Sequence, residues 1–343
     1  MTEPNPSCAP HLPPRRGRLR ILAAGLLAAL AATAWLAPGR AAAQGPAWPS
    51  RPVTLVVPFT AGSTSDITAR LVAQKIAGPL GQPVVVDNRP GANGQIGMQA
   101  VARAAPDGHT LVVGSVSSTV VPGVLSKVPP FDILKDYAPV AVIAGTTLVL
   151  LATKDAPYNT VAELVAAAKK APGTMTYANS AGLYRISMEA LNLQAGLDLA
   201  PIAYKGPAEA ANDLVGGRLS VAPDSLGSAT KLVQAGRTKA LAVLSGRRSP
   251  ALPEVPTMLE LGYRDFDYNG WISILAPAGT PPAVLQRLAD EIAKAVAADD
   301  VQQQYRAVAL DPVFMGPKEY GELLAREIAK YQRVVRDARI EKQ

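Results

Sequence analysis

A run of apolar residues leads into a loop of small and hydroxyl-bearing residues, and the loop leads into a segment with helical spacing. The run covers residues 53–57, and its length and β-branched composition are typical of a buried strand. Residues 65–80 repeat apolar side chains every three or four positions, which predicts a helix. The first turn of a helix has unpaired backbone N–H groups that attract anions. The loop 60–66 is therefore a predicted anion site, although the same residues can also act simply as a helix cap.

The chain repeats this order of strand, donor-rich loop and helix. A predicted strand at 175–178 enters the loop 179–184 and then a predicted helix at 185–195. Residues 110–113 form another predicted strand, which enters a third hydroxyl-rich loop at 114–119. Ligands of open α/β sheets bind at the carboxyl ends of strands. Three such loops favour a shared anion site over three separate helix caps.

The N-terminus has the order of a secretory signal peptide. Four arginines precede the apolar stretch 21–36, which is followed by Pro38, Gly39 and three alanines. This order predicts a signal peptide over 1–43 that is cut after Ala43. One alternative is a retained membrane anchor, but the stretch is shorter than the roughly 20 residues that a membrane span needs. Two adjacent arginines also resemble the twin-arginine signal, but their flanking residues fit it poorly.

Removal of this segment changes the charge and the chemistry of the chain. Residues 1–43 carry five basic residues and one acidic residue, so the formal charge of +7 falls to +3. The only cysteine, Cys8, leaves with the signal, and His109 is then the only histidine. We therefore expect no thiol nucleophile, disulfide, metal site or cofactor. No cluster of Lys and Arg with interleaved aromatic residues follows, so no nucleic-acid partner is expected either.

Alternating strands and helices continue to the end of the chain and predict an α/β fold with parallel, doubly wound sheets. About 300 residues remain after cleavage, more than one hydrophobic core normally serves, so two domains are expected. A helix over 228–235 and a strand over 310–314 belong to this pattern.

Enzymatic catalysis is the alternative to a binding function, and the sequence gives it little support. The phosphate-binding motif Gly-x4-Gly-Lys, the dinucleotide motif G-x-G-x-x-G and the nucleophile motif G-x-S-x-G are absent. Ser228 and Lys231 fit the short pattern S-x-x-K, but its companion motifs are missing. We therefore expect that the protein is not an enzyme.

A set of short motifs spans the mature chain in a fixed order. They are Pro58-Phe59-x-x-Gly62-x-x-Ser65-Asp66, Asp87-Asn88-Arg89-Pro90-Gly91-Ala92-x-Gly94, Ala105-Pro106-Asp107-Gly108, Tyr204-Lys205-Gly206, Asp224-Ser225-Leu226 and Gly270-Trp271. Together they resemble the substrate-binding proteins of tripartite tricarboxylate transporters, also called the Bug family. Each motif is weak by itself, but the ordered set is specific.

The resemblance implies a type II periplasmic-binding-protein fold, in which two α/β domains are joined by two crossing strands and close on a ligand. Domain I would comprise residues 44–142 and 269–343, and domain II residues 143–268. The implied function is a periplasmic protein, monomeric in the usual case, that captures a small organic carboxylate. Integral-membrane permease subunits of a tripartite tricarboxylate transporter would receive the ligand. The alternative is a sensory protein that docks on a sensor kinase without transport.

The resemblance also implies which residues contact the ligand. Backbone N–H and hydroxyl donors of two loops would bind a carboxylate, and these loops supply Phe59, Thr60, Ser63, Thr64, Ser65, Asp66, Asn179, Ser180, Ala181 and Gly182. Further predicted ligand-binding residues are Ser115, Ser117, Tyr204 and Asp224. For Asp224 the alternative is a helix cap.

The second loop departs from the family pattern. Leu183, Tyr184 and Arg185 replace small residues, and Ser187 stands where relatives have histidine. We place Tyr184 and Arg185 among the ligand-binding residues. A planar guanidinium can bind a carboxylate through two hydrogen bonds. This suggests the hypothesis that Arg185 pairs with a second carboxylate, and the alternative is a solvated helix residue.

Overall fold

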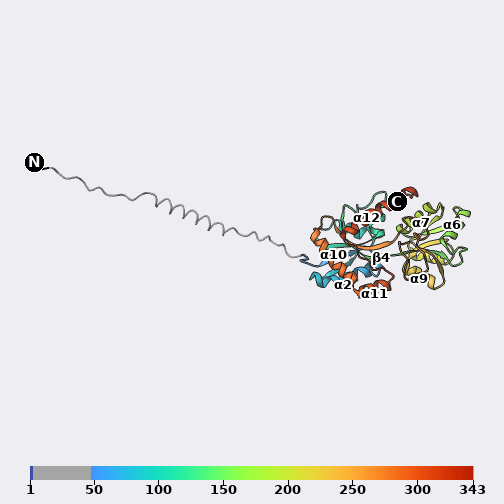
Figure 1. Ribbon diagram of the computed structural model, residues 1–343, viewed down its shortest axis with the longest axis horizontal. Helices are drawn as coiled ribbons and strands as arrows, with labels where there is room; N and C mark the ends of the chain where they lie inside the picture. The colour runs from blue at the N-terminus through green and yellow to red at the C-terminus, as the bar shows by residue number, and fades with distance from the viewer. Residues whose placement is uncertain (3–47, 343) are drawn as a thin grey trace. The chain divides into compact units, whose positions relative to one another are not determined.

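The computed structural model describes residues 1–2 and 48–342, and Figure 1 shows helices arranged around two β-sheets. The predicted signal peptide and its cleavage after Ala43 lie outside the described residues. Among the helices of the described part, none combines the length and apolar character needed to cross a membrane.

Each sheet has five strands. The first sheet has the order β2-β1-β3-β10-β4, with the bounds β1 Val53–Val57, β2 Val84–Asn88, β3 Thr110–Ser115, β4 Tyr137–Thr146 and β10 Gly270–Pro277. The second sheet has the order β7-β6-β8-β5-β9, with the bounds β5 Leu148–Thr153, β6 Thr176–Asn179, β7 Ala200–Ala203, β8 Val221–Ser225 and β9 Thr238–Val243. The chain passes to the second sheet between β4 and β5 and returns between β9 and β10.

Helices cover both faces of the first sheet, and we call this sheet with its helices the first lobe. Alternate residues of β1 therefore enter two cores: Val53, Leu55 and Val57 pack with one set of helices, and Val56 packs with the other. Burial on both faces explains why four of the five residues of this strand are apolar. The helices of this lobe are α2 Thr64–Leu80, α3 Gln95–Ala102, α4 Val116–Thr119, α5 Val121–Leu125, α10 Pro282–Ala297, α11 Asp299–Ala307 and α12 Pro317–Asp337, with a 3-10 turn at Ala92–Gly94.

The second sheet with its helices forms the second lobe (Figure 1). Its helices are α6 Val161–Lys170, α7 Gly182–Ala195, α8 Pro207–Val215 and α9 Leu226–Gln234. Val149 and Leu151 of β5 pack with residues of α8 and α9, whereas Leu148 and Leu150 pack toward α6 and α7. Successive side chains of a strand point to opposite faces of the sheet, so β5 also contributes to two separate cores.

Both sheets are mixed, whereas strand–helix alternation predicted parallel sheets. Strand β10 runs antiparallel to β3 and β4, and β5 runs antiparallel to β8 and β9. Parallel neighbouring strands need a crossover connection, usually a helix, within the same sheet. Strands β5 and β10 are instead entered from the other lobe, so this requirement does not apply to them. The carboxyl ends of β1, β6 and β8 still lead into helices, as predicted, whereas β3 leads into the short helix α4, where only a loop was predicted.

Some predicted elements were wrong in detail. The predicted strand at 310–314 is absent, because Asp311 and Met315 form only isolated bridges to β4. Helix α7 begins at Gly182 instead of residue 185, and α9 begins at Leu226 instead of residue 228. These earlier starts bring the free N–H groups of both helices close to the ends of the preceding strands.

Candidate functional site

A cavity of about 610 Å³ lies where strands of both lobes end, and we call it the hydroxyl chamber. Residues of the loops after β1, β3 and β8 line it, together with the start of α7 and the strands that connect the lobes. The lining includes Ser63, Thr64, Ser65, Ser115, Ser117, Thr146, Thr147, Ala181, Tyr184, Ser225 and Trp271. No residue in this lining carries a full charge, within the part of the chain that the structure describes.

Three helices of eight or more residues begin with an N-cap residue in the wall of this chamber. Ser63 precedes α2, Ala181 precedes α7 and Ser225 precedes α9. The Oγ of Ser63 accepts a hydrogen bond from the backbone N–H of Asp66, but neither α7 nor α9 has a side-chain cap. Several N–H donors at one cavity therefore lack a side-chain acceptor. The positive ends of these helices make a neutral chamber favourable for an anion.

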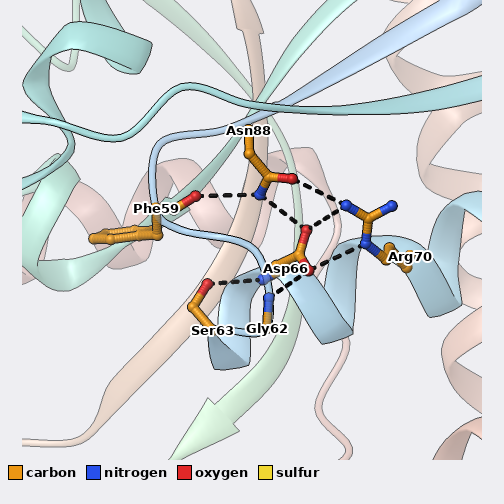
Figure 2. A network of polar contacts seen from close by, with 6 residues as sticks. All are labelled: Phe59, Gly62, Ser63, Asp66, Arg70 and Asn88. Atoms are coloured by element: carbon orange, nitrogen blue, oxygen red, sulfur yellow. Dashed lines mark hydrogen bonds and ion pairs between the residues drawn. The ribbon is translucent and has the colours of Figure 1, made fainter.

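Asp66 holds the first loop in place (Figure 2). Its carboxylate accepts hydrogen bonds from the Gly62 backbone N–H and the Asn88 Nδ2, both at 2.9 Å, and from the Arg70 Nε at 3.1 Å. Asn88 also donates to the Phe59 carbonyl at 3.1 Å, so the network joins the end of β1, the end of β2 and the start of α2. Burial by itself would raise the pKa of Asp66, but these hydrogen bonds outweigh it and hold the pKa below its ordinary value.

The replacement Asp66→Asn should destabilise the protein in a pH-dependent way. A carboxylate with a lowered pKa stabilises the folded state above about pH 4, and this contribution disappears as the pH falls through the folded-state pKa. We expect a loss of about 1–3 kcal/mol at pH 7. The difference from wild type should narrow toward pH 3, measured by thermal unfolding across this range.

Asp87→Asn is the matched control for this replacement, because Asp87 forms an exposed pair with Arg89. Such surface pairs contribute little to stability. A loss for Asp66→Asn that was equal to that of Asp87→Asn, or that did not change with pH, would contradict the positioning role of Asp66.

Asp224 is buried at the end of β8, directly before the chamber residue Ser225, and is 4% exposed. Its Oδ1 accepts a 2.7 Å hydrogen bond from the Ser225 backbone N–H, while its Oδ2 has no hydrogen-bond partner among residues 48–342. Burial raises the pKa of Asp224, although hydrogen bonds from Ser228 and Ser225 partly oppose the change. Burial raises the pKa of Tyr184, and the negative charge of Asp224 raises it further.

Asp224→Asn should stabilise the protein at alkaline pH. Because the folded-state pKa of Asp224 is raised, its ionisation costs stability as the pH rises above its unfolded value. Asparagine is neutral at every pH, so the variant should unfold at a higher temperature than wild type at pH 8. The two midpoints should converge toward pH 4. This account would be contradicted if the variant unfolded at a lower temperature than wild type at pH 8. It would also be contradicted if the difference between the two midpoints grew on acidification.

A second cavity of about 410 Å³ adjoins the first, and we call it the cationic chamber. Phe59, Ser117 and Ala181 line both cavities. The remaining lining of the cationic chamber includes Asn93, Gln95, Val121, Pro122, Leu125, Asn179, Ser180, Gly182, Arg185, Tyr204 and Lys205. Asn93 lies in the 3-10 turn Ala92–Gly94 and Gln95 is the first residue of α3, and neither is among the predicted ligand-binding residues.

The structure therefore brings most of the predicted ligand-binding residues together. The exceptions are Thr60, Asp66 and Asp224, which do not line either chamber within the described part of the chain. Tyr204 lines the cationic chamber, but its hydroxyl donates a 2.8 Å hydrogen bond to Asp213. Sequence reasoning missed Asn93, Gln95, Lys205 and Trp271 as lining residues, although Lys205 and Trp271 belong to motifs that carried the family resemblance.

The two lobes meet beside the cationic chamber. A side chain at Gly182, at the start of α7, would overlap Val121 of α5. Glycine is thus needed for the close approach of these two helices. The contact lies next to Ala181, which lines both chambers.

Comparisons with known proteins match most of the chain. A family model described as "Tripartite tricarboxylate transporter family receptor" matches residues 68–340. Protein BugT of Bordetella pertussis is 35% identical over 294 residues, which are 84% of this chain and 90% of BugT.

Two solved structures from Rhodopseudomonas palustris are also similar. One, determined with adipate, is 33% identical with a TM-score of 0.73, and the match covers 86% of this chain and 99% of that chain. MatC with bound malate is 29% identical with a TM-score of 0.69, and the match covers 84% of this chain and 100% of MatC.

These matches confirm the predicted family and the two-domain α/β fold. The family consists of receptors for transporters and not of enzymes, which agrees with the absence of the enzyme motifs. The chain belongs to the tripartite tricarboxylate transporter receptors, a family of periplasmic solute-binding proteins.

Proposed function

We propose that this protein captures a small carboxylate in the periplasm and delivers it to the permease of a tripartite tricarboxylate transporter. The observation that supports this most is the neutral hydroxyl chamber with the N-termini of α2, α7 and α9 in its wall. Fixed backbone N–H groups and serine hydroxyls bind a carboxylate through hydrogen bonds that its charge strengthens. The adipate and malate in the two related structures support the same class of ligand.

Closure of the two lobes on the ligand is the proposed mechanism. The first lobe would move as one domain and the second lobe as the other, around Thr146–Leu148 and the segment before Gly270. The ligand would touch α2 in the first lobe and α7 and α9 in the second. Contacts that exist only in the closed state shift the population toward that state. The permease would then recognise the closed, loaded form.

A thermal-shift experiment tests the ligand class. Residues 44–343, first stripped of co-purified ligand, are heated with adipate, malate, hexanoate and the matched neutral amide of hexanoate. A carboxylate at about 100 times its dissociation constant adds roughly 2.7 kcal/mol to stability. For a chain of this size, the midpoint should rise by a few degrees. A series in which no carboxylate raises the midpoint would overturn the proposal.

Gly182→Val should prevent ligand-dependent closure without unfolding the protein. The added side chain would overlap Val121 and hold the lobes apart. Small-angle scattering should show a ligand-dependent contraction for wild type and none for the variant. Combining the replacement with Val121→Ala should restore part of the contraction.

Gly78→Val is the control for this experiment, because Gly78 lies on the exposed face of α2 with open space around its Cα. That variant should contract like wild type. Contraction of the Gly182→Val protein to the same extent would show that the contact between α5 and α7 does not limit closure.

A further inference from the structure

Building on the proposed carboxylate site, we propose that the cationic chamber is a second anion subsite formed by Arg185 and Lys205. The protein would then select carboxylates that carry a second anionic group at the far end of an apolar spacer. The first carboxylate would lie in the hydroxyl chamber, against the helix N-termini.

The charges of the two chambers differ sharply. Arg185 and Lys205 both line the cationic chamber, and its lining contains no aspartate or glutamate within residues 48–342. Neither side chain takes part in an ion pair with the described residues. Two cations in a lining that contains no acid make this cavity the more positive end of the site.

The acids nearest to these cations in sequence are engaged elsewhere. Glu189, one turn after Arg185 on α7, accepts a 2.7 Å hydrogen bond from the hydroxyl of Tyr177. Glu209 accepts a hydrogen bond from the backbone N–H of Lys205 at 3.2 Å, close to the start of α8. Both carboxylates thus have partners other than the two side-chain cations. The Arg185 guanidinium lies close to the Tyr177 hydroxyl, but neither it nor the Lys205 amine forms an ion pair with a carboxylate of the described residues.

Arg185 does not behave like a solvated surface residue. Its Nε is buried and has no hydrogen-bond partner among the described residues. Buried N–H donors are almost always paired, and a guanidinium has five donors in a planar fork that fits a carboxylate. An unpaired donor in the wall of a cavity therefore points to a ligand group that completes its hydrogen bonds. Ser180, whose Oγ is also buried without a partner, lines the same chamber.

Apolar side chains line part of the surface between the two ends of the site, alongside the polar Ser117, which lines both chambers. Phe59 and Ala181 line both chambers, and Val121, Pro122 and Leu125 line the cationic chamber. A ligand that reached from the helix N-termini to Arg185 would run beside these side chains. Methylene or aromatic groups in its middle would be buried favourably there, whereas polar groups would lose hydrogen bonds to water. This defines the ligand class as dicarboxylates with an aliphatic or aromatic spacer.

Calorimetric titration of a matched ligand pair tests the second subsite. Adipate and adipic acid monoamide have the same length and shape but differ in one negative charge. We expect wild type to bind adipate about 10- to 100-fold more tightly than the monoamide, the range for hydrogen bonds to a charged group. Arg185→Gln should weaken adipate binding by a similar factor and leave monoamide binding nearly unchanged. Lys205→Gln, at an exposed position, should reduce the same preference by a smaller factor.

Arg237→Gln is the matched control, because Arg237 is exposed in the second lobe and lines neither chamber. It should bind both ligands as wild type does. Equal binding of adipate and monoamide by wild type would overturn the second subsite and leave the proposed carboxylate function intact. An Arg185→Gln variant that lost affinity for both ligands equally would overturn it as well. Failure of succinate, adipate, suberate and terephthalate to bind wild type, while hexanoate binds, would overturn the second subsite alone, whereas failure of hexanoate as well would overturn both proposals.

Discussion

The candidate site depends on backbone N–H groups at the starts of helices, which the fold gathers at the carboxyl ends of strands from both sheets. Helices α2, α7 and α9 each begin at the wall of the hydroxyl chamber, and two of them lack a side-chain cap. A cavity without a charged side chain can thus favour an anion, because its donors are fixed before the ligand arrives. The hydrogen bonds of Asp66 maintain this arrangement by tying the first loop to β2 and α2.

In the proposed mechanism, the same arrangement links binding to domain closure. One set of donors belongs to the first lobe and the others to the second, so a carboxylate can satisfy all of them only when the lobes are close. Gly182 permits that approach, since any larger residue there would overlap Val121. Fold, site and the proposed motion are therefore connected through the short segment Ala181–Arg185, which includes residues that depart from the expected family pattern.

The parts of the site that are local in sequence could be predicted from the residues alone. The loops after β1, β3 and β6 were recognised because strand, small polar residues and helix follow one another within about 25 residues. Asn93, Gln95 and the apolar face of α5 were missed, because their place beside the second lobe depends on tertiary packing. The predicted strand at 310–314 failed for a similar reason, because this segment lies along β4 with only isolated bridges. The directions of β5 and β10 could not be predicted from the alternation of strands and helices along the chain, because these two strands follow the passages between the lobes.

A crystal structure of the protein with the carboxylate that binds most tightly would test the central claim most directly. The account predicts one carboxylate in the hydroxyl chamber, within hydrogen-bond distance of backbone N–H groups at the start of α2 in the first lobe and of α7 or α9 in the second. A carboxylate bound only by side-chain cations, or a ligand located outside the two chambers, would contradict it.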